Sequence, residues 1–295
     1  MLIQSEFDIR FQLAQATPMM AMLHLHPTLA SAVRAEDALR IEHEVPGHAV
    51  GFHPTIDTSE FDDIFGNRCS RFVAPEGIVR LSGKNTVELE DVPDPIPQHA
   101  RQAPVEELPE HVLPFLLASR YCEVDRFIKI AEDLFRGIAP GWERAAAIRD
   151  WVHEKVTFNY SAARPTKSAM DVFTERVGVC RDFQHLAITL SRCQNIPARY
   201  VTGYLGDVRH PHSGPGDFSA WYQVFLDGQW WTMDARHNGP RFGRVLMAVG
   251  RDATDVAITT SFGNADLKHF WVESNEVTCI PAVAVVQELP VSVAS

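Results

Sequence analysis

The sequence predicts an α+β fold in which a β-rich N-terminal domain precedes a core of helices packed on an antiparallel sheet. Up to about residue 90, short apolar runs alternate with polar residues, as they do in half-buried strands. Between residues 91 and 114, six prolines interrupt the chain at close spacing. Beyond this segment, apolar residues first recur at helical spacing and then return to strand-like alternation.

The β-rich domain is expected to span residues 1–90. Its apolar runs include Phe7–Leu13 and Val79–Leu81, and prolines and glycines separate the runs. This pattern is typical of antiparallel strands joined by turns. We assign residues 91–114 to a linker, because neither a continuous helix nor a central strand tolerates prolines at that density. Residues 115–295 then form the core domain.

Three helices and at least five strands are expected in this core domain. The apolar spacing predicts helices over residues 124–138, over 145–156, and between Gly178 and Pro197. Alternation predicts strands at residues 198–205, 221–226 and 229–234, with two or three more after Gly243 that end near Val286.

Composition excludes several classes of partner. The chain has 295 residues, and 27 Lys and Arg against 38 Asp and Glu give a net charge of −11, which argues against nucleic acid. No apolar stretch is long enough to cross a bilayer, and Met1 to Arg10 lack the pattern of a secretory leader. Five scattered cysteines fit free thiols in a reducing compartment. We therefore expect a cytoplasmic protein without a membrane partner.

Cys180 is the main candidate for chemistry. It opens the third predicted helix, directly after Gly178 and Val179. A thiol at a helix N-terminus lies beside unpaired backbone N–H groups and the positive end of the helix dipole, which favour the thiolate and are expected to lower its pKa. The same N–H groups can stabilise an oxyanion.

A predicted hairpin brings two further residues near this helix. Asp227 and Gly228 form a two-residue turn between alternating runs, which is a strong hairpin signal. The resulting register places Ser219, Trp221, Asp234 and Arg236 on one face of the sheet. Ser219 and Asp234 are then diagonal neighbours roughly 7–8 Å apart, a gap that an imidazole and a carboxylate can bridge. A serine side chain is too short to bridge it.

These motifs resemble the bacterial transglutaminase-like family of papain-type cysteine hydrolases, over about residues 146–238. The matching segments are Asp171-Val172-Phe173, Gly178-Val179-Cys180-Arg181-Asp182-Phe183, Ile196-Pro197-Ala198-Arg199-Tyr200-Val201, Gly203-Tyr204, Ser219-Ala220-Trp221 and Met233-Asp234. The β-rich N-terminal segment is similar to the accessory domain that precedes the core in many members. The family pattern has His-Ala-Trp where this chain has Ser219-Ala220-Trp221.

The resemblance implies a Cys-His-Asp triad with Cys180 as nucleophile, Asp234 as the residue that orients the imidazole, and Ser219 at the histidine position. It implies acyl transfer from a peptide or protein amide through a thioester on Cys180, with water favoured over an amine as acceptor. The Cys180 backbone N–H would stabilise the tetrahedral oxyanion.

Two hypotheses remain open on the sequence alone. The chain is either an active hydrolase that recruits a base from His237, His212 or a bound water, or a catalytically silent relative whose cleft binds peptide or protein partners. Regular strand alternation would direct His237 to the opposite face from Asp234. His212, with His210, lies in a glycine-rich loop that leads to Ser219 and could fold over the cleft.

The other histidines and cysteines suggest no cofactor or metal. His24 and His26 share a face of a predicted strand but lack a third ligand, and Pro46-Gly47 breaks the helix that a zinc motif over His43–His48 requires. No glycine-rich phosphate loop is present. His185 faces away from the thiol on the same helix, and Cys122 and Cys193 are expected to be structural.

Overall fold

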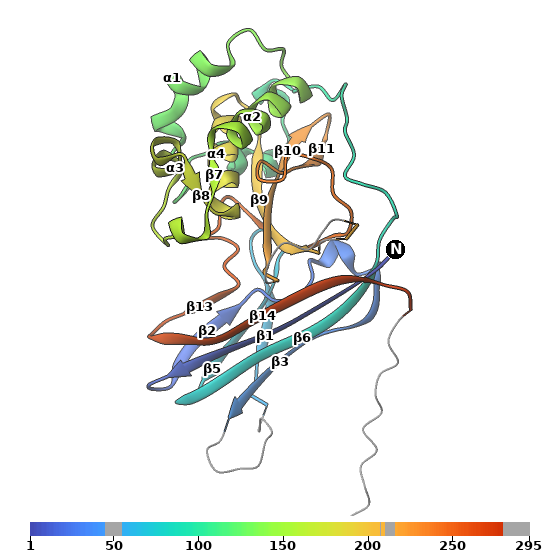
Figure 1. Ribbon diagram of the computed structural model, residues 1–295, viewed down its shortest axis with the longest axis vertical. Helices are drawn as coiled ribbons and strands as arrows, with labels where there is room; N and C mark the ends of the chain where they lie inside the picture. Colours follow the sequence, from blue (N-terminus) through green and yellow to red (C-terminus); the bar gives the residue numbers. More distant parts are fainter. Residues whose placement is uncertain (45–54, 207, 210–215, 280–295) are drawn as a thin grey trace, which may run out of the picture.

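Four long antiparallel strands form one sheet of the computed structural model, which describes residues 1–44, 55–206, 208–209 and 216–279. In order across the sheet they are β14 (Ala265–Val277), β1 (Leu2–Leu13), β6 (Gly77–Glu88) and β3 (Val33–Glu44). Every second residue of β1 is buried, as expected for a strand with one face on a core. Figure 1 shows these strands side by side below the helices.

A second four-stranded sheet packs with the first. Its strands in order are β13 (Thr259–Ser261), β2 (Thr17–Ala21), β5 (Arg68–Ala74) and β4 (Ser59–Asp62). Apolar residues of both sheets, among them Phe7, Met19 and Phe72, belong to one buried cluster. The two sheets therefore share one core, which also takes in Tyr204, Val245 and Met247 from a third sheet.

Two strands of these sheets come from the C-terminal part of the chain. β14 pairs with β1 along its whole length, and β13 pairs with β2. Both strands fall within residues 115–295, the range assigned to the core domain from the sequence, and they pair with strands from residues 1–90. Most side chains of β14 are exposed, so its sequence carries little of the apolar alternation that identifies a partner sheet. β14 ends at Val277, and the expected strand end near Val286 lies outside the described residues.

The upper part of the molecule contains the third four-stranded sheet. Its strands in order are β11 (Gln229–Met233), β10 (Ser219–Leu226), β9 (Ala198–Leu205) and β12 (Arg244–Gly250). The predicted hairpin register is confirmed, because Leu226 pairs with Gln229. A short parallel pair, β7 (Thr157–Phe158) and β8 (Val177–Gly178), lies just before the helix that carries the candidate nucleophile.

Among the described residues, α-helices form at four places: α1 (Val124–Phe135), α2 (Trp142–Lys155), α3 (Ala169–Glu175) and α4 (Cys180–Cys193). Short 3-10 turns are η1 (Pro27–Leu29), η2 (Val105–Glu107), η3 (Glu110–Leu116) and η4 (Tyr160–Ala162). The sequence predicted α1, α2 and α4 but missed α3, whose seven residues are too few to show a helical period. No helix in the described part of the chain has the length and apolar character that crossing a membrane requires.

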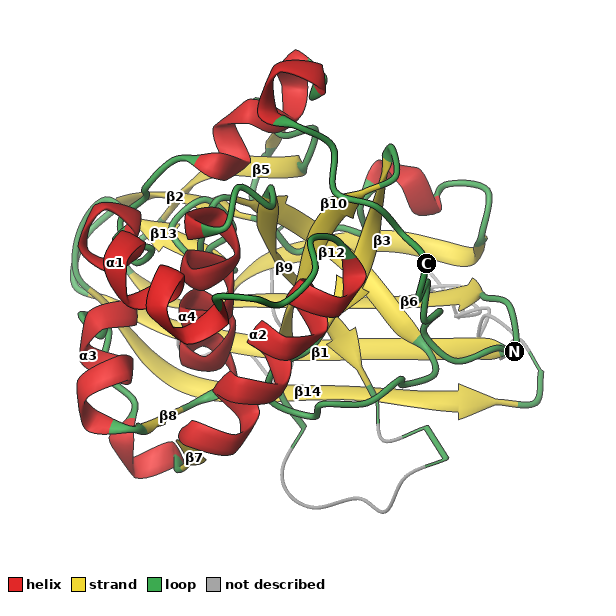
Figure 2. Cartoon of the chain, turned by 90° about the horizontal axis from the view of Figure 1, so that it is seen from above, coloured by secondary structure: helices red, strands yellow, loops and turns green. Residues whose placement is uncertain are grey.

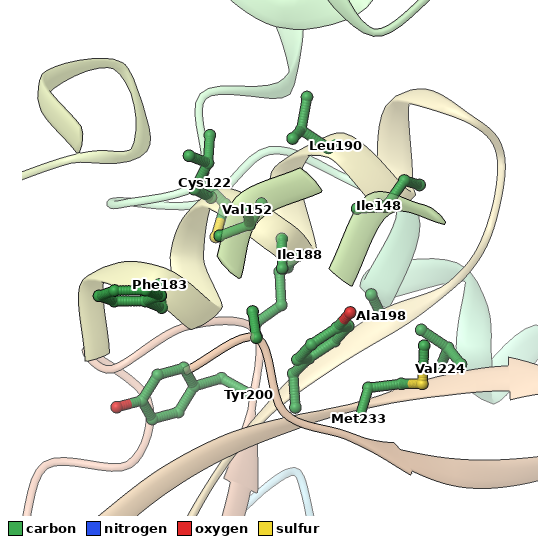
Figure 3. Packing of buried hydrophobic residues seen from close by; sticks show 14 of the residues in the cluster. Cys122, Ile148, Val152, Phe183, Ile188, Leu190, Ala198, Tyr200, Val224 and Met233 are labelled. Atoms are coloured by element: carbon green, nitrogen blue, oxygen red, sulfur yellow. The ribbon is translucent and has the colours of Figure 1, made fainter. Parts of the chain in front are cut away.

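Helix α4 is the centre of the upper part. It contacts α1, α2 and α3 on its outer sides and strands β9 and β10 on its inner side (Figure 2). Ile188 of α4 packs toward Tyr200 of β9, and Val224 of β10 lies in the same cluster (Figure 3). Helices packed on an antiparallel sheet, preceded by a β-rich region, confirm the predicted α+β class.

The proline-rich segment, residues 91–114, packs against the rest of the molecule. Its turn η3 contacts α4 and β9, and Val112 and Phe115 bury their side chains there. At the start of the segment, Asp94 Oδ2 accepts a hydrogen bond from Arg244 Nε at 2.8 Å. The segment is therefore packed along the upper part, and it reaches the region of the predicted site.

Candidate active site

Cys180 is the first residue of α4, as the sequence predicts. A Cβ on Gly178 would lie 2.6 Å from the Cβ of Asp182, so only glycine fits where the chain passes this side chain. The Asp182 carboxylate accepts a hydrogen bond from the Val179 N–H at 3.0 Å and so closes the start of the helix. This local arrangement holds the Cys180 side chain at the exposed end of an otherwise buried helix.

A cavity of about 1000 Å³ opens beside Cys180. It lies between the upper part and strand β14, so both parts of the molecule form its wall. Its lining includes Phe158, Tyr160, Cys180, Arg209, Asp217, Ser219, Arg236, His237, Trp271 and Glu273. The structure therefore brings Cys180 and Ser219 together in one cavity and adds His237.

The chain after β11 leaves the strand and makes a turn. The pairing of β10 with β11 ends at Tyr222 and Met233. The Asn238 N–H then donates to the Asp234 carbonyl at 2.9 Å, which closes the turn. The expectation that strand alternation points His237 away from Asp234 is therefore wrong, because the ladder ends one residue before Asp234.

His237 is hydrogen-bonded to Asp234 through both its ring and its backbone. Its Nδ1 lies 2.8 Å from Asp234 Oδ2, and its N–H donates to Oδ1 at 3.1 Å. A carboxylate at Nδ1 fixes the tautomer in which Nδ1 carries the proton and Nε2 has the free electron pair. This is the geometry of an imidazole that an acidic residue orients for proton transfer.

Asp234 is buried and receives several donors. Gln184 Nε2 donates to Oδ1 at 3.2 Å, and Arg244 Nη2 donates to Oδ2 at 2.9 Å. Burial alone raises the pKa of Asp234, but the Arg244 charge and the bonds from His237 outweigh it and hold the pKa well below its usual range. Asp234 is therefore a stable carboxylate at neutral pH.

Ser219 borders the cavity, but within the described part of the chain it forms no hydrogen bond to this carboxylate. It begins β10 and pairs with Gly203 of β9. None of the hydrogen bonds to Asp234 in the described part of the chain comes from Ser219. Asp234 instead binds the imidazole of His237, although Ser219 is too short to reach it.

The pKa of the Cys180 thiol differs from the sequence expectation. Burial raises it to about 11, and the charge of Asp217 adds to the rise. The Arg181 N–H and the charge of Arg236 act in the opposite direction but do not compensate. The helix N-terminus therefore does not produce a thiolate in this state, because desolvation of the sulfur costs more than the helix contributes.

Asp217 lies at the rim of the cavity. Burial raises the pKa of its carboxyl to about 6, although a hydrogen bond from the Phe218 backbone N–H to the carboxylate lowers it in part. The residue is exposed to the solvent of the cavity, and protein surrounds it on its other sides. Asp217 is thus an acidic neighbour of the thiol whose charge state changes near neutral pH.

Arg236 lies between His237 and an aromatic ring. Its Nη1 donates to Nε2 of His237, and its guanidinium carbon lies 3.8 Å from the centre of the Phe158 ring. Donation by arginine requires Nε2 to be the acceptor, in agreement with the tautomer that Asp234 selects. The base nitrogen of His237 is therefore occupied by a protein donor in this state.

Three residues that position the site were missed by the sequence analysis. Gln184 lies one helical turn after Cys180, and that spacing could have identified it. It links α4 to the sheet, because its Nε2 also donates to the Ala220 carbonyl at 3.2 Å. Arg244 and Asp94 gave no such signal, since their contact spans 150 residues of sequence.

The remaining candidate histidines and cysteines lie elsewhere. His185 is buried against Tyr121 and Tyr200, and its Nε2 accepts from the Ala253 N–H. His24 and His26 do not belong to a strand, and they bond Ser70 and Thr28. His210, His212 and residues 45–54, which include His48, lie outside the described residues. Within the described ranges, no three His, Cys, Asp or Glu side chains converge on a metal site.

Comparison with known proteins identifies the relatives of this chain. Residues 128–235 match the core of the Transglutaminase-like superfamily. A crystal structure from Cytophaga hutchinsonii, described as a "putative cysteine protease", is 32% identical, covers 95% of this chain and 93% of that chain, and has a TM-score of 0.81. The periplasmic domain of TgpA from Pseudomonas aeruginosa is 15% identical over 79% of this chain and 87% of that chain, with a TM-score of 0.38, too distant to bear on the site.

An uncharacterized protein of Mycobacterium leprae is 34% identical over 111 residues, or 36% of this chain. This chain spans 39% of the length of that curated relative. The Cytophaga structure matches across both the β-rich part and the helical core, at an identity that goes beyond a shared fold. The chain therefore belongs to the transglutaminase-like superfamily, and residues 128–235 form its core.

Proposed function

We propose that the protein is a cysteine-dependent amide hydrolase, a peptidase or amidase, that forms a thioester on Cys180 and uses His237 as its base. One observation carries this proposal: Asp234 binds Nδ1 of His237 at 2.8 Å beside the cavity that Cys180 also lines. A nucleophile, an imidazole and an orienting carboxylate are the parts that such chemistry needs. His237 thus replaces the imidazole that is absent at Ser219.

In the first half of the reaction, Nε2 of His237 takes the proton of the Cys180 thiol while the sulfur attacks the amide carbonyl carbon. The resulting oxyanion lies near the Cys180 N–H, which the first turn of α4 leaves without an intrahelical acceptor. Transfer of the proton from His237 to the amide nitrogen breaks the C–N bond and releases the amine. The acyl group remains on sulfur as a thioester.

In the second half, Nε2 of His237 takes a proton from water, and the hydroxide oxygen attacks the thioester carbon. Collapse of this intermediate breaks the C–S bond, releases the acid and returns the proton to sulfur. Asp234 stays ionised throughout and stabilises the imidazolium, in agreement with the lowered pKa of its carboxyl. Because the pKa of the Cys180 thiol is raised, the removal of its proton in the first half of the reaction is the step that most needs a base.

The substrate is proposed to be a peptide or protein amide, and the place of action the cytoplasm. The size of the cavity, about 1000 Å³, supports a substrate with several residues rather than a small amide. All five cysteines are free, which is expected in a reducing compartment.

Two observations are also consistent with the alternative, a silent module that binds peptides or proteins. The pKa of the Cys180 thiol is raised to about 11, and Arg236 occupies the base nitrogen of His237. Both features are expected of a site at rest, and both are expected of a site without turnover. Only a measurement of turnover separates the two.

The test is hydrolysis of a mixed peptide pool by the wild type and by Cys180→Ala, followed by mass spectrometry. We expect new termini with the wild type alone. Acid quenching should also trap an acyl adduct on the peptide that contains Cys180. Equal cleavage by both proteins, or none by either, would reject the hydrolase and leave the binding module.

A further inference from the structure

We propose that Arg236 recognises a carboxylate group of the substrate beside the scissile amide, and that this recognition uncovers the base nitrogen of His237. The inference deepens the proposed function and rests on it for its catalytic consequence. It concerns one side chain that lies in the cavity, contacts the base directly, and has no acidic partner in the described part of the chain.

The first step is that Arg236 blocks the base. Proton transfer from Cys180 to His237 needs the electron pair on Nε2, because Nδ1 is bonded to Asp234. Arg236 Nη1 donates to this same Nε2. An occupied Nε2 cannot accept a proton, so Arg236 has to move before the reaction begins.

The second step is that Arg236 has unused donors. Its Nε is buried without a hydrogen-bond partner, and its contacts are one neutral nitrogen and the face of Phe158. Stacking on a ring leaves the donors at the edge of the guanidinium plane available. By comparison, the cavity arginine Arg209 already binds Asp91 and Glu276.

The third step decides which group displaces the contact. A hydrogen bond from arginine to a carboxylate is charge-assisted and about twice as strong as one to a neutral acceptor, and it can be bidentate. A substrate carboxylate therefore outcompetes the neutral Nε2 for Arg236, whereas an uncharged amide does not. The exchange leaves Nε2 free to accept the proton of Cys180.

The carboxylate can be an acidic side chain or a free C-terminus next to the scissile bond. Both present the same planar group to Arg236. Glu273 and Asp217 also line the cavity, but neither forms an ion pair with Arg236, and Glu273 accepts from Asn275 Nδ2 at 2.8 Å. Among the described residues that line the cavity, Arg236 is thus the arginine without an acidic partner. It lies beside Nε2 of His237, the nitrogen that has to become free.

The first experiment compares iodoacetate with iodoacetamide, which differ by a carboxylate. Site-specific mass spectrometry gives the alkylation rate of Cys180 with each reagent, and exposed Cys279 in the same sample gives the intrinsic ratio. We expect the iodoacetate preference of Cys180 to exceed that of Cys279 at least about tenfold, which is about 1.4 kcal/mol. Arg236→Gln should reduce the difference to about twofold or less, and Arg236→Lys should retain part of it.

Arg209→Gln is the matched control, because it removes one positive charge from the same cavity. If both glutamine variants lose the preference equally, the effect is the general field of the cavity and the proposal is wrong. It is also wrong if Cys180 and Cys279 show equal ratios in the wild type. This comparison uses the wild type alone, so it tests the proposal even if the Arg236 variants do not fold.

The second experiment uses peptide pairs that differ by Glu or Gln beside the scissile amide, and pairs with a free or amidated C-terminus. We expect the wild type to prefer one acidic series about tenfold in kcat/KM and Arg236→Gln to lose the preference. Hydrolysis without preference rejects the role of Arg236 and keeps the hydrolase. An iodoacetate preference without hydrolysis keeps carboxylate recognition and rejects the hydrolase.

Discussion

Ser219 and His237 border the same cavity, but different kinds of backbone hold them. Ser219 begins a strand and is paired in the ladder with Gly203, so the alternation of β10 fixes its direction. His237 lies in a turn whose N–H groups bind the carboxylate of Asp234. The difference teaches that a turn at the end of a strand can bring an imidazole to a carboxylate when the strand position holds another residue.

The largest effect should come from removing one residue of this pair. We expect His237→Ala to lower kcat/KM by about a thousandfold or more, since loss of a triad member typically costs that much. Ser219→Ala should change it by about threefold or less, because Ser219 has no bond to Asp234. Peptide hydrolysis measures both, and unfolding curves control for stability. Equal losses would return the catalytic role to position 219.

The second prediction concerns the support of the carboxylate. Arg244→Gln should destabilise the fold by about 3–5 kcal/mol, because it leaves a buried carboxylate without its cation. Urea unfolding at neutral pH measures this. Arg209→Gln removes two exposed ion pairs, with Asp91 and Glu276, and should cost about 1 kcal/mol or less. Similar losses in both variants would show that Arg244 does not hold Asp234.

The pH dependence of this stability has a defined sign. The pKa of Asp234 is lower in the folded protein than in the unfolded chain, so its contribution is present above the unfolded carboxyl pKa. The contribution is lost as the pH falls through the folded pKa. The wild type should therefore lose stability on acidification more steeply than Arg244→Gln. Parallel curves would contradict the assignment.

A smaller effect tests whether the strand position can still work. Ser219→His should not raise the activity of the wild type, since His237 already binds Asp234. In the His237→Ala background, however, it should restore about tenfold of the lost rate by presenting a ring from β10. Overpacking could cost about 1–3 kcal/mol of stability. No rescue in a folded double variant would indicate that the two positions are not equivalent.

The smallest effect separates the neighbours of the thiol. Asp217 raises the pKa of Cys180 when it is ionised, so Asp217→Asn should speed iodoacetamide alkylation of Cys180 about two- to fivefold at pH 8. Because the pKa of Asp217 is about 6, the gain should vanish below that pH. Glu273→Gln is the control, since Glu273 lines the cavity but is not among the groups that shift this pKa. Equal gains would remove the specific role of Asp217.

The sequence located Cys180 as the candidate nucleophile, Asp234 as the candidate orienting carboxylate, and the strands of the hairpin, because each depends on short-range rules. Gly178 and Asp182 fix the start of α4, and the Asp227-Gly228 turn fixes the hairpin register. It did not predict the pKa of Cys180, since desolvation depends on which segments pack over the sulfur. The expected direction of His237 was wrong, because it required the strand pairing to continue beyond Met233.

The sequence by itself thus determined the α+β class, the superfamily resemblance and the positions of Cys180 and Asp234, because helix starts, turns and alternation are local properties. Only the tertiary structure decided that β14 lines the cavity, that Arg244 joins Asp234 to Asp94, and that the ring of His237 binds Asp234. Each of these depends on where a strand ends or on contacts between distant segments, and local patterns do not encode such contacts.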